Sequence, residues 1–271
     1  MACHFVEKGA IVTFLLRHPA VFDADQTIQE YVKKGKARLV KGDALSRAEV
    51  EHGWTIASEP EDGDAADATS HNCPVDVLLF TSHFASFRIG GTPSFHLTQG
   101  FVLNPPDLCS RSILNALSTV PKAHPYPRIV AVTSTGLTPT AYATLPLAVR
   151  LLYIFLKSAH EDKRGAERVL AYCMGVNEPV QKILPDGWEK TEGLAQRGEL
   201  KSVVVVRPAL LTDGDCRADK GGEEYRVRME GDLAVKGGYT VSRKDVAHLI
   251  TERVLGEEWS KWEGKGISVA Y

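Results

Sequence analysis

The sequence has no surplus of basic residues. Its 271 residues include 32 Lys and Arg against 34 Asp and Glu, which gives a formal net charge of −2. Proteins that bind nucleic acids or anionic membranes usually carry a basic patch, and this balance indicates none. We therefore expect no nucleic-acid partner and no membrane partner, and a small molecule is the expected ligand.

Metal-binding spacings and long apolar runs are also missing. The five cysteines show no CxxC or HxxxH spacing, so we expect free thiols in a reducing compartment and no metal site. The most apolar stretch, at 145–159, contains Arg150 and is shorter than the roughly 18 to 20 residues of a membrane span. No signal-peptide pattern opens the sequence. These absences predict a cytoplasmic protein and leave its oligomeric state open.

The sequence does contain a series of short, continuous apolar runs, which are typical of buried strands in parallel sheets. They lie at 10–17, 37–43, 75–82, 128–135, 201–211 and 266–271. Segments with helical character separate them, at 23–35, 104–121, 160–175 and 242–256. This alternation predicts an α/β fold with a doubly wound parallel sheet. We expect one domain over residues 1–271, with surface loops near 57–74, 82–96 and 176–200.

Candidate cofactor contacts follow the first two strands, because ligands of such sheets bind at the carboxyl ends of the strands. Arg17 ends the first apolar run, where an arginine favours the 2′-phosphate of NADP over NAD. The alternative is a solvated arginine at a strand end. Asp43 ends the second run and could accept a hydrogen bond from the adenine amino group. It could equally begin a turn.

Further candidates follow later strands. Thr81 and Ser82 end the third run, where small residues would let the backbone approach the middle of a dinucleotide. Arg207 and Pro208 lie in the run at 201–211. The proline fixes the exit of the chain, and the following residues could cover the nicotinamide. A structural ion pair is the alternative role for Arg207.

Three residues are candidates for catalysis. Ser134 follows the strand at 128–135 and could donate a hydrogen bond to a substrate carbonyl. Lys163, in the next helical segment, could contact the cofactor ribose. His160 could donate a proton, because the unperturbed pKa of histidine lies near neutrality. Alternatively, His160 belongs to the polar first turn of a helix.

Together these motifs resemble the atypical short-chain dehydrogenase/reductases, and most of all the NAD(P)H-binding, NmrA-like proteins of fungi. The matching segments appear in the family's order over nearly the whole chain: VTFLLRHP, KGDAL, LLFTS, VTSTGL, HEDKRGAERVL, VVRPALLTDG and SRKDVAHLI. The resemblance implies a Rossmann fold and NADP or, less favoured, NAD. Relatives include flavin and biliverdin reductases and redox sensors that bind the cofactor without turnover.

The sequence departs from the family at two places. The family opens with a strand and a GATGxxG turn that binds pyrophosphate at a helix N-terminus, and both would precede Ala2 here. We therefore expect a sheet without its first strand. The family's YxxxK pattern is also broken, because Ala159 lies four residues before Lys163.

Three functions remain open. The first is an NADPH-dependent oxidoreductase that acts on a small carbonyl, quinone or flavin-like substrate. The second is a non-catalytic, NmrA-like cofactor sensor. The third is a truncated paralogue that binds no cofactor.

Overall fold

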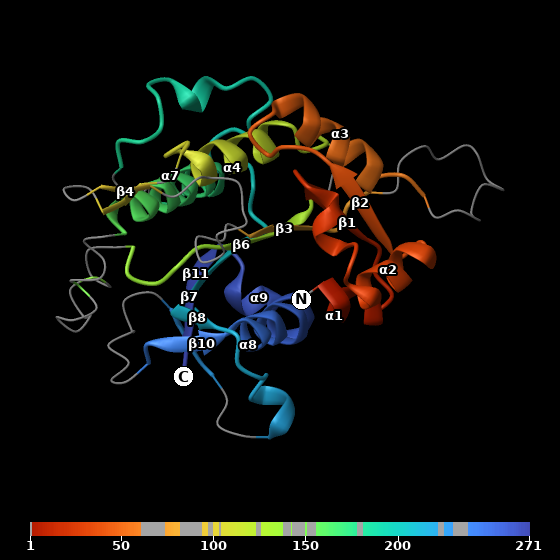
Figure 1. Cartoon of the computed structure of the whole chain (residues 1–271). Helices are drawn as coiled ribbons and strands as arrows, with labels where there is room; N and C mark the ends of the chain where they lie inside the picture. The colour runs from red at the N-terminus through yellow and green to blue at the C-terminus, as the bar shows by residue number, and fades with distance from the viewer. Residues whose placement is uncertain are drawn as a thin grey trace.

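The structure, a computed structural model, centres on a five-stranded sheet with the order β3-β6-β7-β11-β9 (Figure 1). Its strands are parallel apart from β9, which runs antiparallel to β11. They span β3 (Val77–Thr81), β6 (Arg128–Val132), β7 (Val203–Pro208), β11 (Lys265–Ala270) and β9 (Arg226–Met229). The structure describes residues 2–60, 74–81, 94–96, 100–102, 104–122, 126–137, 142, 150, 156–177, 181–221, 225–229 and 238–271.

Three strand pairs lie outside this sheet. The parallel pairs are β1 (Val12–Leu16) with β2 (Ala37–Lys41), and β8 (Leu210–Thr212) with β10 (Thr240–Ser242). The antiparallel pair is β4 (Ser94–His96) with β5 (Gly100–Val102). In the described part of the chain, no backbone ladder joins β1 to β3. The gap between β1 and β3 is where the first strand of the resembled family would lie.

The helices connect these strands. The α-helices are α1 (Ala2–Glu7), α2 (Gln26–Lys33), α3 (Arg47–Ala57), α4 (Leu108–Ser118), α7 (Lys157–Met174), α8 (Arg243–His248) and α9 (Trp259–Trp262). Shorter or irregular helical segments are η1 (Pro19–Phe22), η2 (Trp188–Lys190), η3 (Ala218–Lys220) and the π-helical η4 (Leu249–Glu257). No helix in the described residues is both long and apolar enough to cross a membrane.

Local signals explain where several helices begin and end. The side chains of Asp25 and Ser242 accept hydrogen bonds from the backbone amides of Ile28 and Asp245, which caps α2 and α8. Gly175 ends α7 with φ +74°, a conformation that glycine adopts without steric cost. These ends were readable from the sequence.

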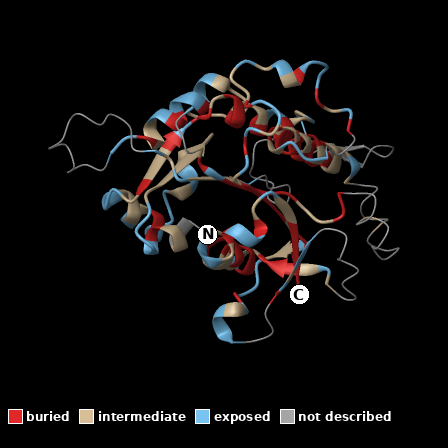
Figure 2. Ribbon diagram, turned by 180° about the vertical axis from the view of Figure 1, so that it is seen from behind, coloured by how far each residue is buried: buried red, intermediate tan, exposed pale blue. Residues whose placement is uncertain are grey.

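The core has two main layers, one on each face of the five-stranded sheet (Figure 2). On one face, α4 and α7 cover Ile129, Ala131 and Val203. On the other face, α8, η4 and α9 pack against Val204 and Ile267. Helices on both faces of a mainly parallel sheet define the doubly wound α/β arrangement, so the predicted fold class is confirmed.

The structure also contains elements that the sequence did not indicate. Helix α3 and strands β9 and β10 lie outside every predicted segment. The connection at 176–200 is more than a polar surface loop, because Leu184 and Trp188 are buried in the α4–α7 layer. The loops expected at 57–74 and 82–96 fall largely outside the described residues.

Candidate functional site

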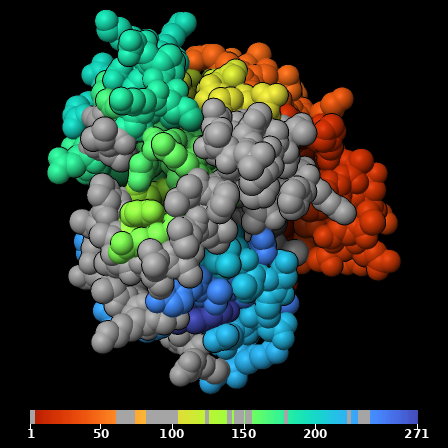
Figure 3. Space-filling view, turned by 60° about the vertical axis from the view of Figure 1, so that its left-hand side comes forward, coloured from red at the N-terminus to blue at the C-terminus, as the bar shows by residue number. Residues whose placement is uncertain are grey.

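A buried polar site lies where β6 ends beside α7. Lys163, buried in the middle of α7, donates hydrogen bonds from Nζ to Ser134 Oγ at 3.3 Å and to the Thr133 carbonyl at 3.4 Å. Ser134 is half-buried. The structure therefore brings together two of the three predicted catalytic residues at the carboxyl end of a central strand. Yellow-green and green residues of this region reach the molecular surface (Figure 3).

Burial also alters the proton affinity of the lysine. Removal from water lowers the pKa of the Lys163 ammonium, while negative charge on Cys109, Glu167 and Asp162 acts in the opposite direction. The net direction is downward. A lysine with a lowered pKa is a common feature of proton-transfer sites.

A buried ion pair between Glu167 and Arg207 lies next to this site. Glu167 is 4% exposed, and its carboxylate accepts hydrogen bonds from Arg207 Nε and Nη2, both at 2.9 Å, and from Thr133 Oγ1 at 2.6 Å. Glu167 thus links α7, β6 and β7. The alternative role for Arg207, a structural ion pair, matches this geometry, because its guanidinium is committed to Glu167.

Pro208, predicted with Arg207 to contact the cofactor, is the last residue of β7. Its carbonyl accepts a hydrogen bond from the Thr135 amide at 3.0 Å. This contact ties the exit of β7 to the segment that follows Ser134. A contact between Pro208 and a cofactor stays a prediction.

His160 lies in the first turn of α7, one turn before Lys163. Burial lowers its pKa to about 3, and the positive charges of Lys163 and Arg164 lower it in the same direction. The imidazole is therefore neutral near pH 7. His160 was considered as a proton donor because the unperturbed pKa of histidine lies near neutrality. That reason does not hold here, because the surroundings lower the pKa.

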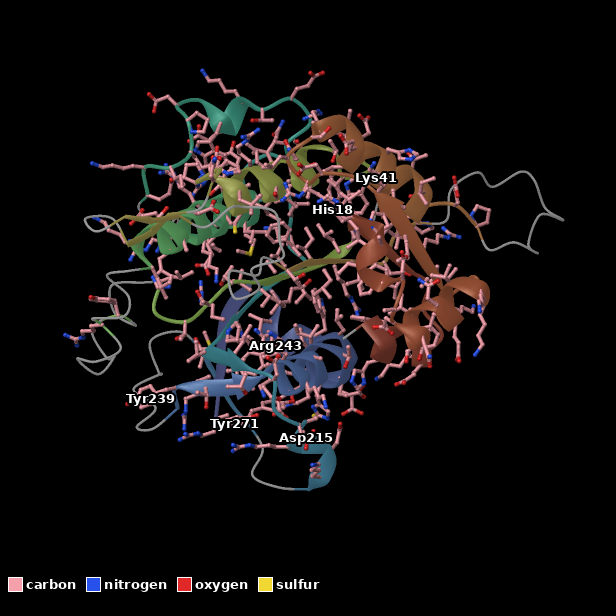
Figure 4. All side chains as sticks on the ribbon, in the orientation of Figure 1. His18, Lys41, Asp215, Tyr239, Arg243 and Tyr271 are labelled. Atoms are coloured by element: carbon pink, nitrogen blue, oxygen red, sulfur yellow. The ribbon has the colours of Figure 1, made fainter. Side chains whose placement is uncertain are left out.

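The predicted adenosine contacts lie at the ends of β1 and β2. Arg17 Nη1 is 3.5 Å from Asp43 Oδ2, and both side chains are about one-third exposed. Figure 4 shows the adjacent residues His18 and Lys41 at these strand ends. Because exposed ion pairs add little stability, the Arg17 guanidinium can exchange this partner for a phosphate at small cost. Thr81 ends β3 and is exposed, whereas Ser82 lies outside the described residues.

Two functional positions escaped the sequence reasoning. Glu167 lies four residues after Lys163, a helical spacing that places both on one face of α7. The buried Asp162 accepts hydrogen bonds from the Cys109 and Ser110 amides at 2.7 and 2.8 Å. The four-residue spacing from Lys163 could have identified Glu167. The residues that Glu167 and Asp162 contact lie far from them in the sequence, so local patterns could not show those contacts.

The donor set suits a dinucleotide better than a metal ion. In the described residues, no cluster of His, Cys, Asp and Glu could hold a metal. Arg17 offers a half-exposed cation, and Lys163 and Ser134 offer polar groups at the carboxyl edge of the sheet. No glycine-rich pyrophosphate turn is identified among the residues with described positions. Binding of a dinucleotide by these side chains stays a prediction.

Comparison with known sequences gives one curated relative and no matching family model. The relative is "Reductase pytE" from Aspergillus terreus, which is 29% identical over 177 residues. The match covers 62% of this chain, and the chain spans 59% of the relative's length.

Solved structures share the fold. A short-chain dehydrogenase/reductase from Veillonella parvula in complex with NADP matches with a TM-score of 0.54 and 13% identity, covering 97% of this chain and 94% of that chain. ChuY, an anaerobillin reductase from Escherichia coli O157:H7, matches with a TM-score of 0.51 and 16% identity, covering 99% of this chain and 90% of that chain. These similarities show the Rossmann-type fold of short-chain dehydrogenase/reductases.

Proposed function

We propose that this protein is an NADPH-dependent oxidoreductase that reduces a small carbonyl, quinone or flavin-like substrate. The proposal treats residues 1–271 as one domain of a cytoplasmic protein. It is supported by the reductase name of the sequence relative and by the NADP-bound structural neighbour. The finer resemblance to NmrA-like proteins of fungi is part of the proposal.

One observation carries it. The buried Lys163 reaches Ser134 at the carboxyl end of β6, which is the edge where doubly wound sheets bind their ligands. Burying an ammonium group costs free energy unless it has partners. A structural lysine could be replaced by an apolar residue at lower cost, so its presence beside a half-exposed hydroxyl favours a chemical role.

The expected roles follow from the position of each side chain. Arg17 binds the 2′-phosphate of NADPH, and Asp43 faces the adenine. Lys163 holds the nicotinamide ribose, and Ser134 orients the substrate oxygen. Thr81 and Pro208 line the middle and nicotinamide end of the site, and the contact expected for Ser82 rests on the sequence alone. When bound, the cofactor supplies a hydride.

Binding and turnover test this function separately. We expect NADPH, measured by isothermal titration calorimetry, to bind at micromolar concentration and to be oxidised with at least one substrate of a carbonyl, quinone and flavin panel. Absence of both binding and turnover would contradict the proposal and would favour the truncated paralogue without a cofactor.

Arg17→Ala tests the assigned nucleotide. The variant should bind NADPH about 10-fold or more weakly, because a charge-assisted contact to phosphate is lost. NADH, which lacks the 2′-phosphate, is the matched control and should bind the variant and the wild type equally. Equal losses for both nucleotides would contradict the role of Arg17.

A cofactor sensor is the second candidate, and Ala159 favours it. This residue is buried at the position where the family has its tyrosine, so the usual general acid is missing. A sensor would bind NADPH with the same dependence on Arg17, but no substrate of the panel would accelerate its oxidation.

A further inference from the structure

The site needs a proton donor other than His160 and the tyrosine of the resembled family. The side chain of Ala159 carries no proton to donate, and His160 is neutral near pH 7 because burial and two neighbouring cations lower its pKa to about 3. Reduction of a carbonyl to an alcohol still consumes one proton for every hydride. Among the described residues at the end of β6, Ser134 and Lys163 carry protons for this step.

Ser134 and Lys163 have the geometry of a relay. The ammonium of Lys163 donates to Ser134 Oγ at 3.3 Å, which leaves the serine hydroxyl proton free to point elsewhere. Lys163 is 9% exposed, whereas Ser134 is half-buried. The lysine is therefore largely shielded from solvent, whereas part of Ser134 remains accessible.

Groups on two elements favour the charged form of Lys163: Asp162 and Glu167 on α7, and Cys109 on α4. Lys163 and Arg164 in turn both lower the pKa of His160. Arg207 on β7 acts indirectly, because its guanidinium pairs with Glu167. Glu167 also accepts a hydrogen bond from Thr133, the residue before Ser134. Glu167 is therefore both a source of negative charge near the ammonium and an anchor for the serine-bearing segment.

We propose that Ser134 and Lys163 form a proton relay that replaces the missing tyrosine, with Glu167 as the residue that positions the relay. This inference rests on the proposed oxidoreductase function. A bound reduced nicotinamide would supply the electron pair, as a hydride, for the substrate carbon. The Ser134 O–H bond breaks as its proton moves to the substrate oxygen, and an N–H proton of Lys163 moves to Ser134 Oγ. The resulting neutral amine of Lys163 then takes up a proton from solvent.

Substitutions at both relay positions test the pathway. Ser134→Ala and Lys163→Met should each lower kcat by about 100-fold or more, which is the usual contribution of a general acid. Ser134→Thr keeps the hydroxyl and should retain most of the activity. Circular dichroism would establish that each variant is folded, and NADPH binding would establish that Ser134→Ala keeps its cofactor site.

The role of Glu167 is tested through pH. Because the relay needs a charged Lys163, kcat/KM should fall as pH rises through the lysine pKa. Glu167→Gln removes a negative charge that favours the ammonium, so this limb should move to lower pH by about one unit. Glu161→Gln is the matched control, since it removes the same charge from the same helix, where Glu161 pairs with Arg164. Its pH profile should match the wild type.

A second measurement does not depend on turnover. The Lys163 pKa can be followed by NMR of ¹³C-labelled lysine in the protein without cofactor, where Glu167→Gln should lower it and Glu161→Gln should not. Wild-type turnover with unchanged kcat in Ser134→Ala would overturn the relay and leave the oxidoreductase standing. Failure of the wild type to oxidise NADPH with any substrate would overturn both.

Discussion

At the scale of single residues, His160 shows how an environment can reverse the expected chemistry of a side chain. An imidazole in water is half-protonated at about pH 6.5. Beside Lys163 and Arg164, and largely removed from water, it stays neutral until about pH 3. The residue lies close to the candidate site, and its imidazole is neutral near pH 7.

This shift has a consequence for stability. Between about pH 6.5, the ordinary pKa of histidine, and about pH 3, the unfolded state binds a proton at His160 that the folded state does not. The free energy of unfolding should therefore fall as pH falls through this window. His160→Gln should show a smaller decrease between pH 7 and pH 5 in urea unfolding.

The matched control is His52→Gln, which replaces an exposed histidine of α3. Its free energy of unfolding should change between pH 7 and pH 5 as much as that of the wild type. If the free energy of unfolding of His160→Gln fell as much as that of the wild type between pH 7 and pH 5, His160 would have to be protonated in the folded state.

At the scale of elements, α4 and α7 are joined by a carboxylate that caps one helix from another. Asp107 is the N-cap residue of α4, but its side chain makes no capping hydrogen bond. Asp162 of α7 instead accepts from the amides of Cys109 and Ser110, and also from Ser110 Oγ at 2.8 Å. The N-terminal end of α4 is therefore stabilised by tertiary contact.

Loss of this contact should be costly. Asp162→Ala leaves buried amide donors without their acceptor, and we expect the free energy of unfolding to decrease by about 2–4 kcal/mol. Asp107→Ala should cost about 1 kcal/mol or less, because its ion pair with Arg111 is a surface contact of 3.7 Å. Chemical denaturation measures both, and a larger loss for Asp107→Ala would contradict the assignment.

Close packing of the same two helices depends on Gly165. A Cβ atom at this position would overlap Ser110 Oγ and lie 2.5 Å from Ile183 Cγ2. Gly165→Ala should therefore destabilise the protein by about 1–3 kcal/mol through overpacking. Gly53→Ala in α3 is the control, because its nearest neighbour is a flexible Leu15 methyl group at 3.3 Å. A stable Gly165→Ala protein would show that the helices can separate without cost.

At the scale of the whole molecule, side-chain contacts rather than a backbone ladder connect the β1–β2 sheet to the five-stranded sheet in the described residues. Leu15 of β1 and Leu78 of β3 pack into one apolar cluster with Val50 and Trp54 of α3. In the described part of the chain, no ladder joins these strands. Helix α3 therefore carries much of the coupling between the predicted adenosine end of the site and the Ser134–Lys163 end.

Hydrogen exchange should show this division. Amides of β6 and β7, which are paired on both sides, should exchange more slowly than those of β1 and β2. Trp54→Ala should cost about 3–5 kcal/mol and should raise exchange in β1 and β2 before β6 and β7. Trp54→Phe keeps most of the apolar contact and serves as control. Uniform loss of protection would indicate a single cooperative unit.

The sequence by itself determined the parts of the fold that depend on neighbours along the chain. Apolar runs predicted the strands β1, β2, β3, β6, β7 and β11, because buried parallel strands need apolar residues on both faces. Asp25, Gly175 and Ser242 marked helix ends by local backbone chemistry. The sequence also identified Ser134 and Lys163 as catalytic candidates, but their contact was seen only in the structure.

Only the tertiary structure decided the electrostatics of the site. Whether Arg207 would face a cofactor or Glu167, and whether His160 would be charged, depends on groups brought together from distant segments. The cost of burying a charge is set by all of its three-dimensional neighbours, and their distances do not appear in local sequence patterns. For this reason the fold could be predicted from local patterns, whereas the proton donor of the site could be proposed only from the packed structure.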